Sequence, residues 1–363
     1  MKATLSKSEL ISGLTLVQTA AEKKTTMAIL SNVLITAKEG EVTIASTDLE
    51  ITSSATLKAE VKKRGSTTVN SKLFLDIARE LPEGEVQLEL SENERLTLSC
   101  QRSRFTMNGV SSEEYPGLPG LALEIKDRVQ SRSMLKLIDR TLYAVSSDET
   151  RYNLTGVCFE AVDGGTQAVA TDGHRLSLDF SPELKIESRA IVPRRGLLEL
   201  KKLLETSDEI GLAISGGFLV AESSKYRLAV RLIDGEFPDY TQVIPTDKGV
   251  IAEIPTDELT HSLRRVVLLA TDKTKCVKLD FDKETLFISS SSPDLGEAKE
   301  EIPIRYSGKR ISVGFNARYM LDFLGSINEQ ESIAIELHGE LGPGKFFVRD
   351  DEGYLSIIMP MRL

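Results

Sequence analysis

Two patterns of apolar and polar residues alternate along this chain. Segments such as RLTLSCQRSRFTMNG and IGLAISGGFLVAESSKYRLAVRLI alternate apolar with polar positions, which is typical of half-buried β-strands. Segments such as SKLFLDIARE space their apolar residues three and four positions apart, which predicts amphipathic helices. Glycine-rich points such as SGG and GPG mark turns between strands. Together these patterns predict an α+β protein with antiparallel strands.

The predicted elements recur three times. TTVNSKLFLDIARELPEG has the pattern of a strand, a polar turn and a helix, and AIVPRRGLLELKKLLE and ISVGFNARYMLDFLGSI repeat that order at intervals of about 120 residues. These three helices are predicted to begin near Ser71, Arg194 and Asn316. The recurrence indicates repeated domains rather than one continuous core.

A second helix precedes this one in each repeat. SKSELISGLTLVQTAA, SRSMLKLIDRTLYAVS and PTDELTHSLRRVVLLAT each place Ser, Thr or Asp before an amphipathic run, which is a helix N-cap signal. Leu10, Leu135 and Leu259 occupy matching places. We therefore predict three domains, at residues 1–122, 127–246 and 247–363, each with two helices against an antiparallel sheet.

Composition narrows the class of protein. Of the 363 residues 40% are hydrophobic and 28% charged, which is typical of soluble globular chains. No run approaches the roughly 18 apolar residues of a membrane span, and MKATLSKSEL lacks the apolar core of a signal peptide. Cys100, Cys158 and Cys276 form no CxxC pair. We expect a cytoplasmic protein with no membrane partner, no metal site and no cofactor.

Basic residues gather on the predicted helices. On the helix expected at 133–146 the apolar stripe consists of Met134, Leu135, Ile138, Leu142 and Val145. The basic residues expected on its other face are Arg132, Lys136 and Arg140. Near 194–205 we expect an inward face of Leu197, Leu198, Leu200, Leu203 and Leu204. The residues left for solvent on that helix are Arg194, Arg195, Lys201 and Lys202.

The acidic residues lie mostly elsewhere. In the third repeat His261, Arg264 and Arg265 share one side of a helix, whereas EGEVQLELSENE and PDLGEAKEE belong to loops and strands. A net charge of −10 is unfavourable for a protein that simply coats nucleic acid. A basic helix surface on an acidic chain suits phosphate contact without base readout, although any amphipathic helix has a solvated charged face.

Several motifs resemble one known family. TDGHRLS, the preceding RYNLTGV, the following GEFPDY and the terminal MPMRL, with LSNVLI, STDLEI, LPEG, RSRF, IVPR and GFNARY, resemble the bacterial DNA polymerase III beta subunit, the sliding clamp. The resemblance runs from end to end. It implies three similar domains per protomer and a head-to-tail homodimeric ring around duplex DNA, lined by helices. It also implies a non-catalytic role, tethering the replicative polymerase, and loading by a separate clamp loader.

Domain dimensions agree with a dimer. A domain of ~120 residues has a radius of gyration of ~13–14 Å and spans roughly 35 Å. Three such domains in a closed loop leave no central hole. Six leave a hole roughly 15 Å or more in radius, which is wider than a duplex of ~10 Å radius. The size estimate therefore makes a ring of two chains geometrically reasonable.

The resemblance assigns TDGHRL to a pocket that receives short peptide motifs, between the central and C-terminal domains. The matching residues here are Arg151, Leu154, Thr171, Gly173, His174, Arg175, Leu176, Pro238, Val243, Asn316, Tyr319, Ile357, Met359, Pro360, Met361 and Arg362. Two features suit such a role independently. Methionines repack around varied ligands, and a glycine leaves room for an approaching peptide.

The resemblance also suggests DNA contacts and a ring-closing interface. The expected DNA contacts are Lys24, Lys72, Arg194, Arg195 and Tyr152. The first domain is expected to offer the interface Arg102, Arg104, Phe105 and Met107. The third domain of a partner chain is expected to offer Leu268, Leu269, Glu297, Glu300 and Glu301. An apolar centre flanked by opposite charges is a reasonable interface.

Two other functions compete with this one. An enzyme would use Asp172 and His174 as an acid/base pair with Ser177 as nucleophile, but the sequence holds no GxSxG, HExxH or GxxxxGK[ST] motif. A protein-interaction scaffold that never encircles DNA would also suit the repeat and the pocket. The plainest interpretation of His174 is a hydrogen-bonded turn residue.

Overall fold

The computed structural model describes residues 1–21, 27–125, 127–271, 275–327 and 332–362. Within those ranges six α-helices occur in three pairs. Their bounds are α1 Lys7–Ala21 and α2 Ser71–Glu80, α3 Ser131–Thr141 and α4 Arg194–Leu204, and α5 Thr256–Val266 and α6 Ala317–Ser326. All the strand pairs are antiparallel, so the predicted α+β class and the two helices per repeat are confirmed.

The chain divides into two compact units by its internal contacts. Unit 1 comprises residues 1–132 and 195–232, and unit 2 comprises residues 133–194 and 233–363. Each unit thus takes in part of the central repeat. The three domain boundaries expected from the sequence stay a prediction.

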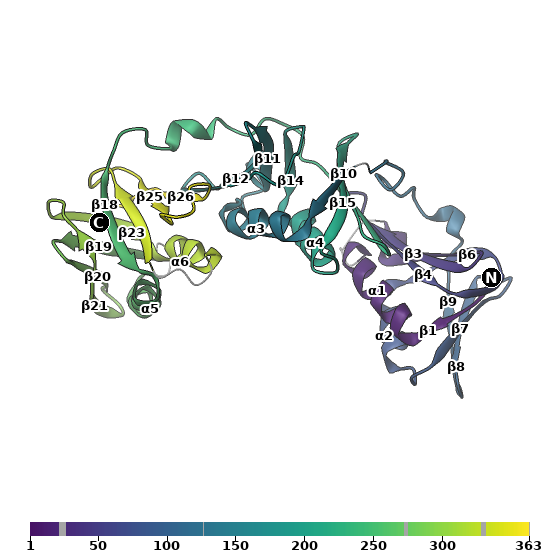
Figure 1. Cartoon of the computed structure of the whole chain (residues 1–363). Coiled ribbons are helices and arrows are strands. Elements are labelled where there is room, and N and C mark those ends of the chain that lie inside the picture. The colour runs from purple at the N-terminus through teal and green to yellow at the C-terminus, as the bar shows by residue number, and fades with distance from the viewer. Residues whose placement is uncertain (22–26, 126, 272–274, 328–331, 363) are drawn as a thin grey trace. The chain divides into compact units, whose positions relative to one another are not determined.

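Unit 1 contains two sheets. The first has the order β5 (Glu60–Lys63), β1 (Lys2–Ser6), β7 (Glu85–Leu90), β8 (Arg95–Cys100) and β9 (Ser103–Asn108). The second has the order β10 (Asp127–Gln130), β15 (Glu209–Ser215), β16 (Phe218–Glu222), β17 (Tyr226–Arg231), β4 (Ile51–Lys58), β3 (Glu41–Thr47), β2 (Asn32–Lys38) and β6 (Gly65–Asn70). Helices α1 and α2 cover these strands, and Leu14 and Phe74 are fully buried between them (Figure 1).

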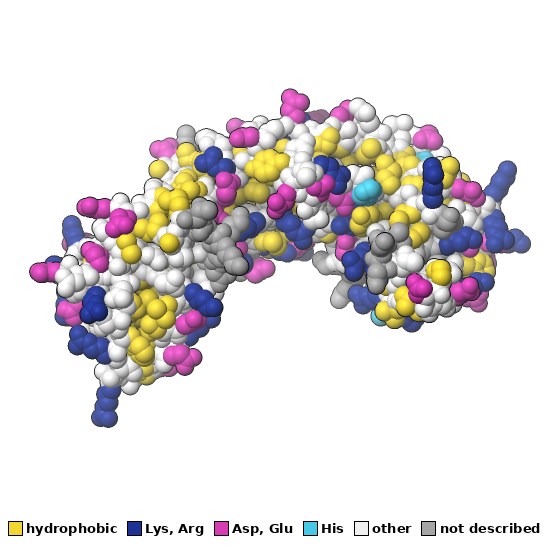
Figure 2. Space-filling view, turned by 180° about the vertical axis from the view of Figure 1, so that it is seen from behind, with side chains coloured by type: hydrophobic (Ala, Val, Ile, Leu, Met, Phe, Trp, Pro, Cys, Tyr) yellow, Lys and Arg dark blue, Asp and Glu magenta, His cyan; other side chains and the backbone are white. Residues whose placement is uncertain are grey.

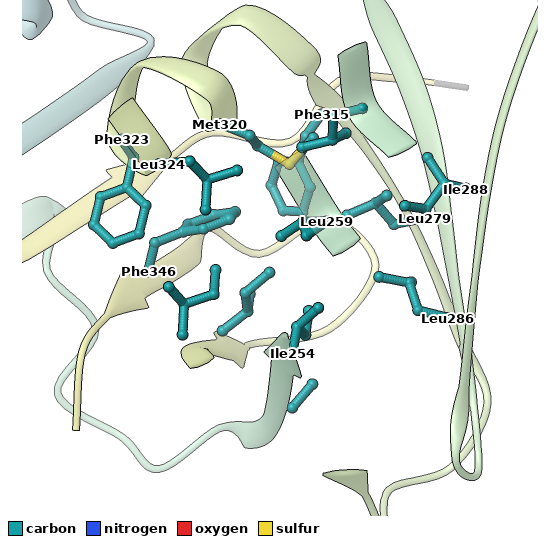
Figure 3. Packing of buried hydrophobic residues seen from close by; sticks show 14 of the residues in the cluster. Ile254, Leu259, Leu279, Leu286, Ile288, Phe315, Met320, Phe323, Leu324 and Phe346 are labelled. Carbon is teal, nitrogen blue, oxygen red and sulfur yellow. The ribbon is translucent and has the colours of Figure 1, made fainter. Parts of the chain in front are cut away.

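Unit 2 also contains two sheets. The larger has the order β14 (Ala190–Pro193), β11 (Gly156–Val162), β12 (Gly165–Thr171), β13 (Arg175–Ser181), β26 (Leu355–Ile358), β25 (Gly344–Phe347), β24 (Ser332–Leu337), β18 (Val250–Pro255) and β22 (Arg305–Tyr306). The smaller has the order β21 (Gly296–Pro303), β20 (Thr285–Ser292), β19 (Cys276–Asp282) and β23 (Ile311–Asn316). Met320 and Phe323 of α6 pack with Phe315 and Phe346 in the core between these strands (Figure 3).

The two large sheets each cross from one repeat to the next. In unit 1 Val230 of β17 pairs with Ile51 of β4, and in unit 2 Ile357 of β26 pairs with Leu176 of β13. Each junction joins the fourth strand of one repeat to the last strand of the next repeat. The backbone hydrogen bonds of the sheet therefore run without a break through both junctions.

Several helix ends match the prediction. Helices α2, α4 and α6 begin at Ser71, Arg194 and Ala317, and the side chain of Asn316 accepts from the backbone N–H of Arg318 at 2.9 Å. Ser6 caps α1 by accepting from the backbone N–H of Glu9 at 3.2 Å. The expected cap of α5 is wrong, because the N-cap residue is Pro255, which has no side-chain bond to give.

Two predicted helix faces are also wrong. The helix expected at 133–146 ends as α3 at Thr141, and its Arg140 is buried rather than solvated, since it bonds Asp351 at 2.7 Å and Asp179 at 3.3 Å. Leu198 of α4 was expected to face inward but is 43% exposed. Both errors arise because helical spacing does not show which neighbours the rest of the chain supplies.

Candidate functional site: a turn and a pocket in unit 2

The Thr171–Arg175 segment is a tight hairpin turn between β12 and β13. The Thr171 hydroxyl accepts from the backbone N–H of Gly173 at 3.1 Å and donates to the carbonyl of Arg175 at 2.6 Å. The Asp172 carboxylate accepts from the backbone N–H groups of His174 at 2.9 Å and Arg175 at 3.0 Å. Gly173 has a φ of +87°, which favours glycine.

The first repeat builds the same turn. Thr47 accepts from the backbone N–H of Leu49 at 3.0 Å, and Asp48 accepts from those of Glu50 at 3.0 Å and Ile51 at 2.7 Å. Leu49 adopts a φ of +75° where the second repeat has glycine. The shared Thr-Asp pair is therefore structural in both repeats, and what distinguishes 171–175 is its surroundings.

Arg175 organises those surroundings. Its guanidinium bonds Asp172 at 3.1 Å, Asp322 at 2.5 Å and the carbonyl of Tyr143, and it lies 4.3 Å from the ring centroid of Tyr319. Only 9% of its side chain is exposed. With its donors occupied, Arg175 holds the turn, α6 and the segment after α3 together rather than reaching outward.

A pocket of about 430 Å³ opens beside this turn. Of the predicted pocket residues, Arg151, His174, Arg175 and Tyr319 line it. The other charged and aromatic residues of the lining are Tyr143, Asp148, Asp172, Arg194 and Asp322. Asp172 belongs to the predicted TDGHRL motif and Arg194 was expected to contact DNA, whereas no sequence pattern marked Tyr143, Asp148 or Asp322 as pocket residues.

Charged side chains that line this pocket bond to each other and to the backbone. Arg151 bonds the Asp148 carboxylate at 3.1 Å and the carbonyl of Asp172 at 2.7 Å. The hydroxyl and backbone N–H of Thr150 lower the pKa of Asp148, so this carboxylate stays ionised. Burial, with Asp172 nearby, raises the pKa of Tyr319, so its phenol stays neutral. The lining is a fixed polar surface.

The predicted apolar residues gather next to it. Leu154, Leu176 and Ile357 are buried in one cluster, and Val243 packs against it. The C-terminal tail runs alongside, because the backbone N–H of Met359 donates to the carbonyl of His174 at 2.9 Å. The structure thus places this apolar cluster beside the polar lining, and Leu154 and Leu176 are close in sequence to Arg151 and His174 of that lining.

Other predicted pocket residues take separate places. Pro238 is exposed, Pro360 and Met361 are half-buried, and Asn316 is the cap of α6. Arg362 lies in a different pocket, beside β19, β20 and β21.

The segment before β18 is anchored at its polar atoms. The amide of Asn153 donates to the carbonyl of Glu236 at 2.9 Å, and Arg189 donates to that of Phe237 at 3.3 Å. The hydroxyl of Tyr240 bonds Glu160. These contacts fix the stretch that carries Pro238 and Val243, a role for Asn153 that the sequence did not suggest.

The groups of the enzyme alternative are not assembled. Ser177 is fully buried, donates to the carbonyl of Arg140 at 2.5 Å and accepts from Tyr143 at 3.0 Å. Asp172 is occupied by its own turn. Among the contacts of the described residues none joins the imidazole of His174 to either group. Those residues also hold no His, Cys, Asp and Glu group able to bind a metal ion, and no helix long and apolar enough to span a membrane.

The predicted DNA contacts differ in their availability. Lys72 and Arg194 are exposed, and Tyr152 is 53% exposed. Arg195 is engaged by the buried carboxylate of Asp48 and by the carbonyl of Thr19 at 3.0 Å. Lys24 lies outside the described residues. On the face shown in Figure 2, basic and acidic side chains are intermixed, so the expected separation of charge is only partial.

The predicted interface residues lie on or near two unpaired sheet edges. Strand β9 is an edge of the five-stranded sheet and β21 an edge of the four-stranded sheet. Arg102, Arg104 and Phe105 are exposed on or beside β9, whereas Met107 faces the core with only 4% exposure and is not available.

The β21 side carries more apolar surface than expected. Leu268 is 73% exposed, Leu269 is half-buried, and Leu295 in the β20–β21 turn, which the sequence did not single out, is 53% exposed. Glu297 and Glu301 are exposed. Glu300 is held by Arg265 at 2.5 and 2.6 Å, which lowers the pKa of that carboxyl.

Comparison with known proteins points in one direction. Family models of the DNA polymerase III beta subunit match the chain over residues 1–119 (N-terminal domain), 128–239 (central domain) and 241–362 (C-terminal domain). The beta sliding clamps of Pseudomonas aeruginosa PAO1 and Escherichia coli K12 are each 31% identical to it, over the full length of both chains.

Solved structures agree. The beta sliding clamp of Caulobacter crescentus, with polyethylene glycol bound in a region proposed to tether beta motifs, superposes with a TM-score of 0.95 at 31% identity, covering 100% of this chain and 99% of that one. The sliding clamp of P. aeruginosa bound to griselimycin superposes with a TM-score of 0.94 at 29% identity, with both chains fully covered.

Proposed function

This chain belongs to the DNA polymerase III beta-subunit family, the bacterial sliding clamps, and we propose that it encircles duplex DNA as a homodimer and tethers the replicative polymerase. In this proposal the chain itself catalyses no reaction. A separate clamp loader is expected to open and close it, and other proteins are expected to dock through short peptide motifs.

The observation that carries the proposal is the way the sheets continue from repeat to repeat. β4 of the first repeat pairs with β17 of the second, and β13 of the second pairs with β26 of the third. The corresponding strands left over are β21 of the third repeat and β9 of the first, and both are unpaired edges. A third antiparallel junction of the same kind requires a second chain, and two such junctions close a ring.

The side chains at those edges support this pairing. Phe105 lies on one edge and Leu268 beside the other, so both would leave water on contact. Arg102 and Arg104 face solvent near β9, and Glu297 and Glu301 face solvent on β21. Opposite charges around an apolar centre favour the head-to-tail arrangement over pairing of like edges.

Retention by enclosure needs only weak contact with DNA. A protein that gripped bases or formed many direct phosphate bonds would not slide, whereas exposed Lys72 and Arg194 can act through intervening water. We keep Lys24 and Tyr152 as candidate contacts. We give Arg195 a smaller part, because Asp48 already occupies its guanidinium.

The polar and apolar halves of the unit 2 pocket suit a peptide. An apolar cluster that includes Leu154, Leu176 and Val243 lies beside the pocket, and the pocket itself is lined by the exposed His174 and the half-buried Arg151. Met359, whose backbone N–H bonds the carbonyl of His174, adds a flexible thioether nearby. Among similar clamps, one is solved with bound griselimycin and another has a region proposed to tether beta motifs, which is consistent with ligand binding by this fold.

A tail deletion tests the docking half of the proposal. Removing residues 359–363 takes away the two methionines and the bond from Met359 to the carbonyl of His174. We expect polymerase stimulation on a primed circle to be lost while the mass in solution stays that of a dimer. A deletion that also yields monomers would mean that the tail is chiefly structural.

A further inference from the structure

A second pocket, of about 660 Å³, lies on the outer face of the four-stranded sheet. Lys278 of β19 is directly opposite Ser289 of β20, which is directly opposite Lys299 of β21. Arg362 completes the lining. Three cations therefore line one groove of a chain whose net charge is −10.

The cations are only partly neutralised. Lys278 bonds Asp280 at 2.9 Å yet keeps 40% of its side chain exposed, and the ammonium of Lys299 lies over the ring of Phe287 at 5.0 Å. Arg362 is exposed, and Glu297 is the one carboxylate among the described lining residues. The groove thus has a surplus of positive charge and a row of hydroxyls, which favours an anionic ligand.

The groove continues from the peptide pocket. The tail bonds the 171–175 turn through Met359 and then bonds β23, since the backbone N–H of Met361 donates to the carbonyl of Gly314 at 2.8 Å. Gly314 pairs in turn with Lys278. A chain leaving the first pocket along the tail would reach the row of lysines within a few residues.

We propose that this groove binds acidic residues that flank the docking motif of a partner peptide. The inference rests on the proposed function of the neighbouring pocket. Neighbouring strands lie about 4.8 Å apart, so Lys278 and Lys299 are roughly 10 Å apart across β20. In the polyproline II conformation a peptide rises about 3.1 Å per residue with three residues per turn, so two carboxylates three positions apart point the same way and would meet both lysines. A nucleic acid fits less well, because none of the described lining residues offers an aromatic ring for base stacking.

Binding of matched peptides to the full-length dimer tests the proposal. The probe is the motif peptide of the same organism's replicative polymerase, labelled for fluorescence anisotropy and extended at either end by Glu-Gly-Gly-Glu or by Gln-Gly-Gly-Gln. We expect the acidic extension at one end to tighten binding about three- to tenfold near 0.1 M salt, and the advantage to vanish near 1 M salt.

Substitution of the two lysines tests whether the groove causes the tighter binding of the acidic extension. Lys278→Gln with Lys299→Gln should abolish the advantage of the acidic extension while the glutamine peptide binds unchanged, and the new amide at 278 can still donate to Asp280. Lys309→Gln, an exposed lysine outside the groove, is the matched control. Sedimentation of the double variant checks that the substitution on β21 leaves the dimer intact.

Three results would overturn the inference. The first is equal affinity for the acidic and the glutamine peptides, whichever end carries the extension. The others are an equal loss of the acidic peptide's advantage in Lys309→Gln, and loss of that advantage when oligo(dT) is added. Failure of the glutamine peptide to bind at all would instead contradict the proposed docking function.

Discussion

Gly173 is constrained both by the backbone conformation of the turn and by the space left beside Arg151 in the pocket. Its φ of +87° is shared by Leu49 at +75° in the first repeat, so the backbone alone tolerates a side chain there at a cost. Space is the second constraint, because a Cβ at 173 would lie 2.8 Å from Nη1 of Arg151. Arg151 would have to leave its 2.7 Å bond to the carbonyl of Asp172.

Gly173→Ala is therefore expected to lose about 1–2 kcal/mol of folding stability and to weaken binding of a motif peptide. The matched control is Gly40→Ala, where φ is +79° and a Cβ would meet nothing within 4 Å. Urea unfolding should show similar losses in both variants, and peptide anisotropy should change only at 173. Unchanged peptide affinity in Gly173→Ala would show that Arg151 has no part in docking.

Asp179 is a buried carboxylate with an unusual pH response. Its exposure is 0%, one of its oxygens has no partner among the described residues, and burial raises its pKa from 3.8 to about 6 against the pull of Arg140 and Lys136. Asp351 also faces Arg140. Because the folded pKa exceeds the unfolded one, the stability that Asp179 contributes is complete below pH 3.8 and is lost as pH rises through 6.

Asp179→Asn should remove this dependence. Between about pH 4 and pH 7 the native chain is expected to lose up to about 3 kcal/mol relative to the variant. Asp351 keeps Arg140 paired in that variant. Urea unfolding across this range measures the difference, with the exposed Asp163→Asn as control. A constant difference between native and variant at every pH would mean that the pKa of Asp179 is the same in the folded and the unfolded chain.

At the scale of elements, the proposed junction between two chains uses the free edges β9 and β21. Phe105→Asp or Leu268→Asp would place a charge in the proposed junction and lose about 1.5–3 kcal/mol of apolar burial at each of its two copies. We expect the dimer dissociation constant to rise by about 100-fold or more.

Sedimentation should then show 40.0 kDa protomers at concentrations where the native chain is a dimer. Leu341→Asp is the control, since this leucine is 84% exposed and lies on the loop between β24 and β25, whose sheet contains neither β9 nor β21. Dimers that persist in both edge variants would place the interface elsewhere.

The sequence predicted where helices and strands lie better than it predicted which residues and strands they contact. The helix starts at Ser71 and Arg194 followed from local spacing and polar residues just before an apolar run. Arg140 was placed in solvent because its partners, Asp179 and Asp351, are 39 and 211 residues away. Continuation of the sheets from repeat to repeat could not be predicted, since a strand that pairs across a junction has the same alternation as one inside a domain.

The pocket shows the same division. The family motif identified His174 and Arg175, and both line it. The role of Arg175 was not foreseen, because its bond to Asp322 and its stacking on Tyr319 depend on the docking of α6. Tertiary contacts of this kind have no local sequence signal.

At the scale of the whole molecule, an acidic clamp has to hold an acidic polymer. With a net charge of −10 the chain has no bulk attraction for DNA, and pairs such as Arg195 with Asp48 reduce its basic surface further. Electrostatic binding also weakens steeply with salt. Under the proposed function, long residence on DNA comes from a closed path around the duplex.

Retention on closed and cut DNA tests this claim most directly. Labelled clamp, placed by its loader on a nicked plasmid circle and separated by gel filtration, is expected to stay with the circle even at moderately raised salt. After a single restriction cut it should slide off the ends within the time of the column. Equal loss from circular and linear DNA would contradict enclosure as the means of retention.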